Sequence, residues 1–184
     1  MVATVCLFLF AIIATATDVW RQKIYNWTTY TGIIVALLLA GLATWLGNLE
    51  LSEVEILPSL IGFASCGAIM LVCFVLFQIG GGDVKLLAMA GAFLGPVPGI
   101  EALLWTFVLG GATAMIVLIW RIGFLKLVKR VFQQLTVRMG FKKWDPLSED
   151  EQKQLQLPLY LAPSALLAIA IVKFSLVERL MTAQ

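Results

Sequence analysis

The sequence contains no histidine. This absence removes the most common general base and the most common metal ligand, so any chemistry must come from other groups. The three cysteines, Cys6, Cys66 and Cys73, lie in apolar segments without C-x-x-C spacing, and they carry no zinc or redox signature. We therefore interpret them as buried, inert thiols and predict no metal ion, no cofactor and no nucleic-acid partner.

Charged residues are also scarce, at 13% of the 184 residues, whereas 61% are hydrophobic. A soluble domain usually carries about a quarter of its residues as charged groups. A helix crosses the hydrocarbon core of a bilayer with roughly 17–25 apolar residues, and the chain contains about six runs close to this length. We predict an all-α, polytopic membrane protein with a single domain over residues 1–184. The expected spans cover residues 2–17, 28–47, 56–79, 84–99, 101–120 and 157–177.

The first apolar run resembles a signal peptide because its end has A-x-A-like small residues. No basic residue precedes the run, however, so we expect it to be retained as a span, with cleavage as the alternative.

Basic residues predict the orientation of the spans. If six helices alternate, all lysines and arginines except Lys173 and Arg179 fall on one side of the membrane. The positive-inside rule makes that side cytoplasmic and places both termini outside. Glu50, Glu53 and Glu55 then lie in an outer loop.

Most of the basic residues belong to a cytoplasmic arm, residues 121–156. Within it, Leu125, Val128, Phe132 and Leu135 recur at helical spacing, which indicates an amphipathic helix lying on the anionic leaflet. A basic loop that only obeys the topology rule is the alternative.

Two aspartates border predicted spans on the cytoplasmic side. Asp18 closes the first span and Asp83 opens the fourth, behind Gly80, Gly81 and Gly82. Taken alone, each acid fits an ordinary helix end, where Asp83 would be a cap and the glycines would terminate the third span. Two carboxylates that meet tend to share one proton, so that one activates water while the other polarises a carbonyl. Glycines beside such a pair would allow a substrate backbone to approach.

Two motifs resemble those of the type IV prepilin peptidases, the membrane aspartyl proteases that remove leaders from pilin and archaellin precursors. Gly80, Gly82, Asp83 and Lys85 match the family's G-x-G-D-x-K motif. The segment from Asp18 is similar to its D-x5-I-P-N signature through Ile24 and Asn26, although Tyr25 replaces the usual proline.

The resemblance implies an endopeptidase that cuts a basic leader from pilin-like precursors at the cytoplasmic face of a bacterial or archaeal cell membrane. Asp18 and Asp83 would be the catalytic residues, and Gly80, Gly82, Lys85 and Asn26 would be supporting positions. The chain lacks the paired C-x-x-C insertion of larger members, so it resembles the short form and methylation is not predicted. Membrane lipids and precursor proteins are the expected partners.

Two other functions stay open. Presenilin-like proteases share a G-x-G-D motif, but they typically pair it with a Y-D sequence, and Thr17 precedes Asp18 here. A small transporter or scaffold could use both aspartates as a proton relay. Such a transporter often has two similar halves, and we find no internal repeat.

Overall fold

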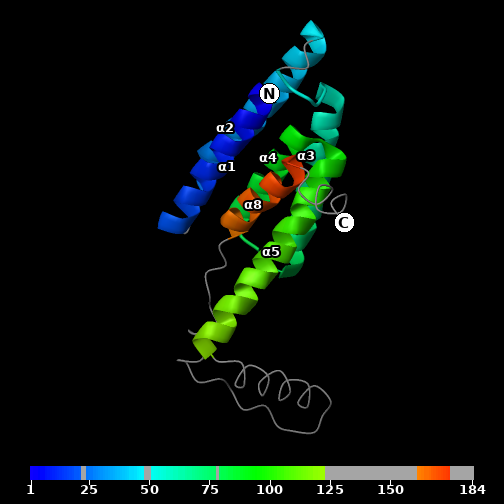
Figure 1. The fold of residues 1–184 in the computed structure, drawn as a ribbon. Coiled ribbons are helices and arrows are strands. Elements are labelled where there is room, and N and C mark those ends of the chain that lie inside the picture. The colour runs from blue at the N-terminus through cyan, green and yellow to red at the C-terminus, as the bar shows by residue number, and fades with distance from the viewer. Residues whose placement is uncertain (22–23, 48–50, 78, 123–160, 175–184) are drawn as a thin grey trace, which may run out of the picture. The chain divides into compact units, whose positions relative to one another are not determined.

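The computed structural model describes residues 1–21, 24–47, 51–77, 79–122 and 161–174, and these form helices and short connections with no strand (Figure 1). The helices are α1 Val2–Arg21, α2 Asn26–Leu46, α3 Ile56–Phe77, α4 Gly81–Leu94, α5 Pro96–Ile122 and α8 Leu161–Lys173. Within the described ranges, α1, α2, α3 and the Pro96–Val117 part of α5 are long and apolar enough to cross a membrane. The prediction of an all-helical membrane protein is confirmed, whereas six spans are not established.

The chain divides into two units, residues 1–109 with 160–184, and residues 110–159. The described part of the second unit is the end of α5, and every contact discussed below lies in the first unit. The predicted basic arm at 121–156 falls almost entirely outside the described residues. Its amphipathic helix, and the single domain over 1–184, therefore stay predictions.

Small residues form the inward faces of the long helices. In α2 the buried positions are Thr29, Gly32, Ala36, Ala40 and Ala43, spaced by three or four residues. Large apolar side chains such as Ile34, Leu38 and Leu42 are exposed on other faces of the same helix. Small residues inside and large apolar residues outside are typical of helices that pack closely within lipid.

Helix α4 lies in the middle of the first unit and contacts α1, α2, α3 and α8 (Figure 1). Its nine residues from Leu86 to Leu94 are all buried. A helix that is apolar on every side is an interior helix. Its 14 residues extend about 21 Å, which is less than the thickness of a bilayer core.

Helices α3 and α4 cross at a contact between glycines. A Cβ added to Gly91 would lie 2.7 Å from Cys66 Sγ, and one added to Gly62 would lie 2.7 Å from the carbonyl carbon of Gly95. The Ser59 hydroxyl donates a 2.6 Å hydrogen bond to the carbonyl of Ala92 at the same crossing. The glycines therefore allow the backbones of α3 and α4 to approach closely at this crossing.

The turn from α4 to α5 comes earlier than the sequence suggested. We expected one span to end at residue 99 and the next to begin at 101, but α4 ends at Leu94 and α5 begins at Pro96. Gly95 adopts a φ of 84°, which favours glycine, and proline is suited to the first position of a helix. Pro96 and Pro98, which we expected within the fourth span, therefore belong to the first turn of α5.

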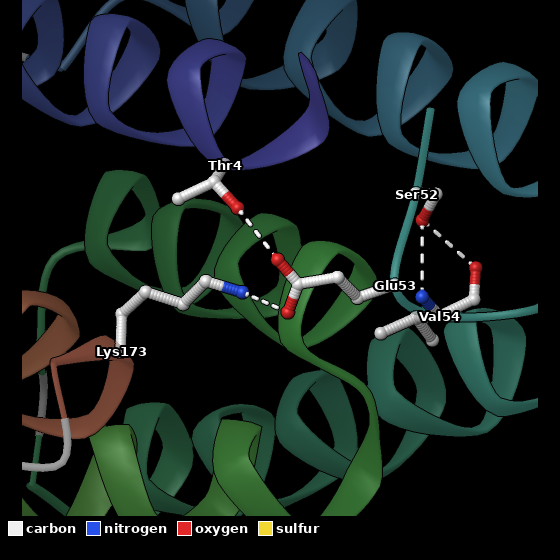
Figure 2. Close-up of polar contacts among 5 residues, drawn as sticks. All are labelled: Thr4, Ser52, Glu53, Val54 and Lys173. Atoms are coloured by element: carbon white, nitrogen blue, oxygen red, sulfur yellow. Dashed lines mark hydrogen bonds and ion pairs between the residues drawn. The ribbon is translucent and has the colours of Figure 1, made fainter. Parts of the chain in front are cut away.

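At the end of the first unit opposite to Asp18, polar contacts join three segments. Lys173 at the end of α8 pairs with Glu53 at 2.5 Å, and the Thr4 hydroxyl of α1 donates to the same carboxylate (Figure 2). The Ser52 hydroxyl accepts from the backbone N–H of Val54 and donates to its carbonyl. Lys173 and Glu53 thus lie at the same end, as alternating spans require.

Candidate active site

Asp18 continues the buried stripe of α1. The stripe consists of Ala3, Leu7, Ala11, Ala14 and Asp18, so helical spacing directs the carboxylate toward the neighbouring helices. Asp18 is 9% exposed, and its Oδ2 has no hydrogen-bond partner among the described residues. A buried carboxylate oxygen without a partner is costly, and such groups concentrate where chemistry is done.

The start of α8 packs against Asp18. The backbone N–H of Ala162 donates a hydrogen bond to the Asp18 carboxylate. One helical turn earlier in α1, the Thr15 hydroxyl donates to the carbonyls of Ala162 and Ala11, at 3.2 Å and 2.8 Å. The N-terminus of a helix favours negative charge, so α8 both orients and stabilises this carboxylate.

Asp83 lies in the first turn of α4, but it is not the cap of that helix. The N-cap is Gly80, whose carbonyl accepts from the Asp83 N–H at 3.0 Å, and no side-chain hydrogen bond caps α4. A Cβ on Gly80 would lie 2.9 Å from Asp83 Oδ2. The carboxylate therefore occupies space that a side chain at Gly80 would take, and α4 includes the next two glycines that we had considered as the end of α3.

Gly82 is the position where the connection between α1 and α2 packs on α4. A Cβ on Gly82 would lie 2.9 Å from the Cβ of Ile24, closer than real side chains approach. Gly81 has more room, because its nearest atom would be Phe74 Cε2 at 3.9 Å. The two sequence motifs thus meet through Ile24 and Gly82, a contact that spacing alone could not reveal.

Tyr25, which stands where the resemblance leads us to expect proline, has a specific contact. Its hydroxyl accepts a 2.8 Å hydrogen bond from the Arg21 guanidinium. Arg21 ends α1 and Tyr25 immediately precedes α2. The tyrosine therefore joins the two ends of the connection, which proline cannot do with its side chain.

Two predicted supporting residues also meet. The Lys85 ammonium donates a 2.8 Å hydrogen bond to Asn26 Oδ1, 59 positions away in the chain. The same ammonium lies 4.9 Å from the ring centroid of Tyr30. Sequence reasoning did not select Tyr30, although it lies one helical turn after Asn26 in α2.

The electrostatic environment links the two aspartates. Asp83 precedes the buried part of α4, outside the four helices long enough to span. Burial, and in addition the negative charge of Asp18, raise the pKa of Asp83 from an ordinary value of 3.8 to about 7. The structure therefore brings Asp18 close enough to influence Asp83, and their catalytic roles stay predictions. In the described ranges, no group of three or more His, Cys, Asp or Glu side chains could hold a metal ion.

Comparisons with known proteins give one match. The family model described as "Type IV leader peptidase family" matches residues 5–115, which is more than half of the chain and includes both aspartates. Neither a curated protein nor a solved structure matches.

Proposed function

We propose, from the premise that this chain belongs to the type IV leader peptidase family, that it is an aspartyl endopeptidase for type IV pilin-like precursors. It removes the basic leader of the precursor at the cytoplasmic face of a bacterial or archaeal cell membrane, which it crosses several times. Family membership supports the protease activity. The aspartyl mechanism, the substrate and the membrane face are our proposal.

The observation that carries the proposal is the electrostatic coupling of two acids from different helices. A pKa near 7 leaves Asp83 protonated in a large fraction of molecules at neutral pH, so it can donate a proton. Asp18 has one oxygen without a partner, which is free to accept a proton. One proton donor and one proton acceptor are what an aspartyl dyad requires.

The reaction follows from these two roles. Asp18 takes a proton from a water molecule while the water oxygen bonds to the carbonyl carbon of the scissile peptide. Asp83 donates its proton to the carbonyl oxygen, which gives a neutral tetrahedral diol. When the C–N bond breaks, the nitrogen takes the proton held by Asp18 and a diol hydroxyl returns its proton to Asp83. The products are a carboxylic acid and an amine, and both aspartates recover their starting states.

Charge patterning supports the cytoplasmic location of this chemistry. In the topology predicted from the sequence, Asp18, Asp83 and Lys85 fall on the side of the membrane that carries the basic arm, whereas Glu53 and Lys173 fall on the other side. The positive-inside rule assigns the more basic side to the cytoplasm. Gly82, Lys85 and Asn26 support the site by holding the start of α4 against Ile24 and the start of α2, and Gly80 leaves room for the Asp83 carboxylate.

Cleavage of a pilin-like precursor in liposomes tests the proposal. We expect Asp18→Asn and Asp83→Asn each to lower the cleavage rate by about 10²–10⁴-fold, since one group cannot both activate water and polarise the carbonyl. Both variants should insert in the membrane like the wild type.

Glu53→Gln is the matched control, because it removes a carboxylate from the opposite end of the first unit, and it should cleave at the wild-type rate. Normal cleavage by either aspartate variant would show that the two acids are not a catalytic pair.

A further inference from the structure

Lys85 is held by two side chains of α2. Its ammonium donates to Asn26 Oδ1 at 2.8 Å and lies over the Tyr30 ring at 4.9 Å from the centroid. In the part of the chain that the structure describes, no ion pair joins Lys85 to a carboxylate. Lys85, Asn26 and Tyr30 together are called the Lys85 clamp below.

The clamp attaches the Lys85 side chain to α2 at two points. Asn26 and Tyr30 are four residues apart, so they share one face of α2. The amide oxygen accepts one of the three ammonium protons, and the ring attracts the cation through its quadrupole. These two contacts restrict the position of the Lys85 ammonium along α2 and the conformation of the Lys85 side chain.

Restricting Lys85 also restricts Asp83. The two residues lie two positions apart at the start of α4, within a single turn. Helix α2 follows α1 after a short connection, and α1 carries Asp18. The clamp therefore fixes the position of Asp83 relative to the helical hairpin of α1 and α2, which carries Asp18.

We propose that Tyr30 is a positioning residue, whose ring holds Lys85 so that the first turn of α4 presents Asp83 to Asp18. This inference rests on the proposed function. Tyr30 is 50% exposed, so its replacement leaves no large cavity, and its influence is exerted through Lys85. If Lys85 instead binds substrate directly, Tyr30 has no effect on the chemical step.

Steady-state cleavage as a function of pH tests the role of Tyr30. We expect Tyr30→Phe to match the wild type because the ring remains, whereas Tyr30→Leu should lower kcat about two- to fivefold with little change in KM. The midpoint of the pH profile of kcat/KM should also shift in Tyr30→Leu, because the separation of the two acids changes. A purely structural role would reduce the amount of folded enzyme without moving this midpoint.

Trp27→Leu is the matched control. Trp27 is 77% exposed in the same part of α2, and its side chain has no contact with Lys85 among those described. It should behave like the wild type. An unchanged kcat and pH profile in Tyr30→Leu, or a rise in KM alone, would overturn the positioning role.

A thermal unfolding cycle tests the clamp without any substrate. Tyr30→Leu should lower the midpoint of thermal unfolding less than Lys85→Met, which also loses the hydrogen bond to Asn26. The double variant should lower it no further than Lys85→Met alone, because the contact between Tyr30 and Lys85 is already broken. Additive shifts would refute the contact itself. Non-additive shifts in a protein that cleaves no precursor would refute the proposed function and leave the clamp standing.

Discussion

The two ends of the first unit use the same residue types in opposite ways. At one end Lys173 pairs directly with Glu53, and Thr4 adds a hydrogen bond to the same carboxylate (Figure 2). At the other end Lys85 bonds to the neutral amide of Asn26, and the described residues include no ion pair for Asp18 or Asp83. Glu53 is thus paired with a cation, whereas Asp18 and Asp83 are not paired with Lys85.

This difference determines how each acid titrates. The hydrogen bond from Lys173 lowers the pKa of Glu53, whereas burial and the nearby Asp18 raise the pKa of Asp83. Structural ion pairs stabilise the charged form of an acid, while sites of chemistry often destabilise it. The contacts at the Glu53 end therefore stabilise the fold, whereas the Asp83 end gives up stability in a manner typical of active sites.

The largest expected effect in this comparison is a gain of stability on removing the charge of Asp83. The folded-state pKa of Asp83 is raised, so its contribution to stability is present below pH 3.8 and is lost as the pH rises through about 7. At pH 8, Asp83→Asn should therefore exceed the wild type in free energy of unfolding by about 2 kcal/mol, after allowance for partial exposure. The gain should shrink toward pH 4, and a gain independent of pH would contradict the assigned cause.

A smaller effect on stability is expected from the packing at Gly82, which holds the Asp83 end in place without an ion pair. Gly82→Ala places a Cβ against Ile24, and this overpacking should cost about 1 kcal/mol and lower cleavage by moving α4 from the α1–α2 connection. Gly81→Ala is the control, because its nearest neighbour is 3.9 Å away and alanine favours a helix. Equal effects of the two substitutions on stability and cleavage would show that close packing at Gly82 is not what holds this end.

The smallest effect belongs to the Glu53 end. The Glu53 side chain is 55% exposed, so Glu53→Gln should lower the free energy of unfolding by less than about 1 kcal/mol at pH 7. Because the folded-state pKa of Glu53 is lowered, the difference should disappear as the pH falls below 4.5. Acidification should therefore remove the stabilisation at the Glu53 end and the destabilisation at the Asp83 end. Denaturation curves across pH should show that the unfolding free-energy difference from the wild type rises toward zero for Glu53→Gln and falls toward zero for Asp83→Asn.

Much of this arrangement was predictable from the sequence. Apolar run lengths located the helices, and the placement of basic residues put Glu53 and Lys173 on one side and both aspartates on the other. Motif resemblance selected Asn26 and Lys85 as supporting positions, and the structure joins them in one hydrogen bond. These features follow from local composition and from the alternation of spans.

The remaining features depend on how helices pack. Tyr30 carries no signal in the sequence, because its contact with Lys85 exists only when α2 and α4 lie side by side. The turn at Gly95 was misplaced because the apolar composition continues through Pro96 and Pro98, which we included in the fourth span, whereas Pro96 begins α5. The depth of α4 within the helix group was equally hidden, since its composition resembles that of the other spans.

Helix α4 also constrains how the protein is made. It is too short to cross a bilayer unaided, and its buried residues from Leu86 to Leu94 have no face left for lipid. If α4 left the translocation machinery alone it would be poorly anchored in the bilayer, so α4 should enter the membrane together with α3, against which it packs. The glycine crossing between α3 and α4 then forms during biogenesis, before the ribosome has completed α8.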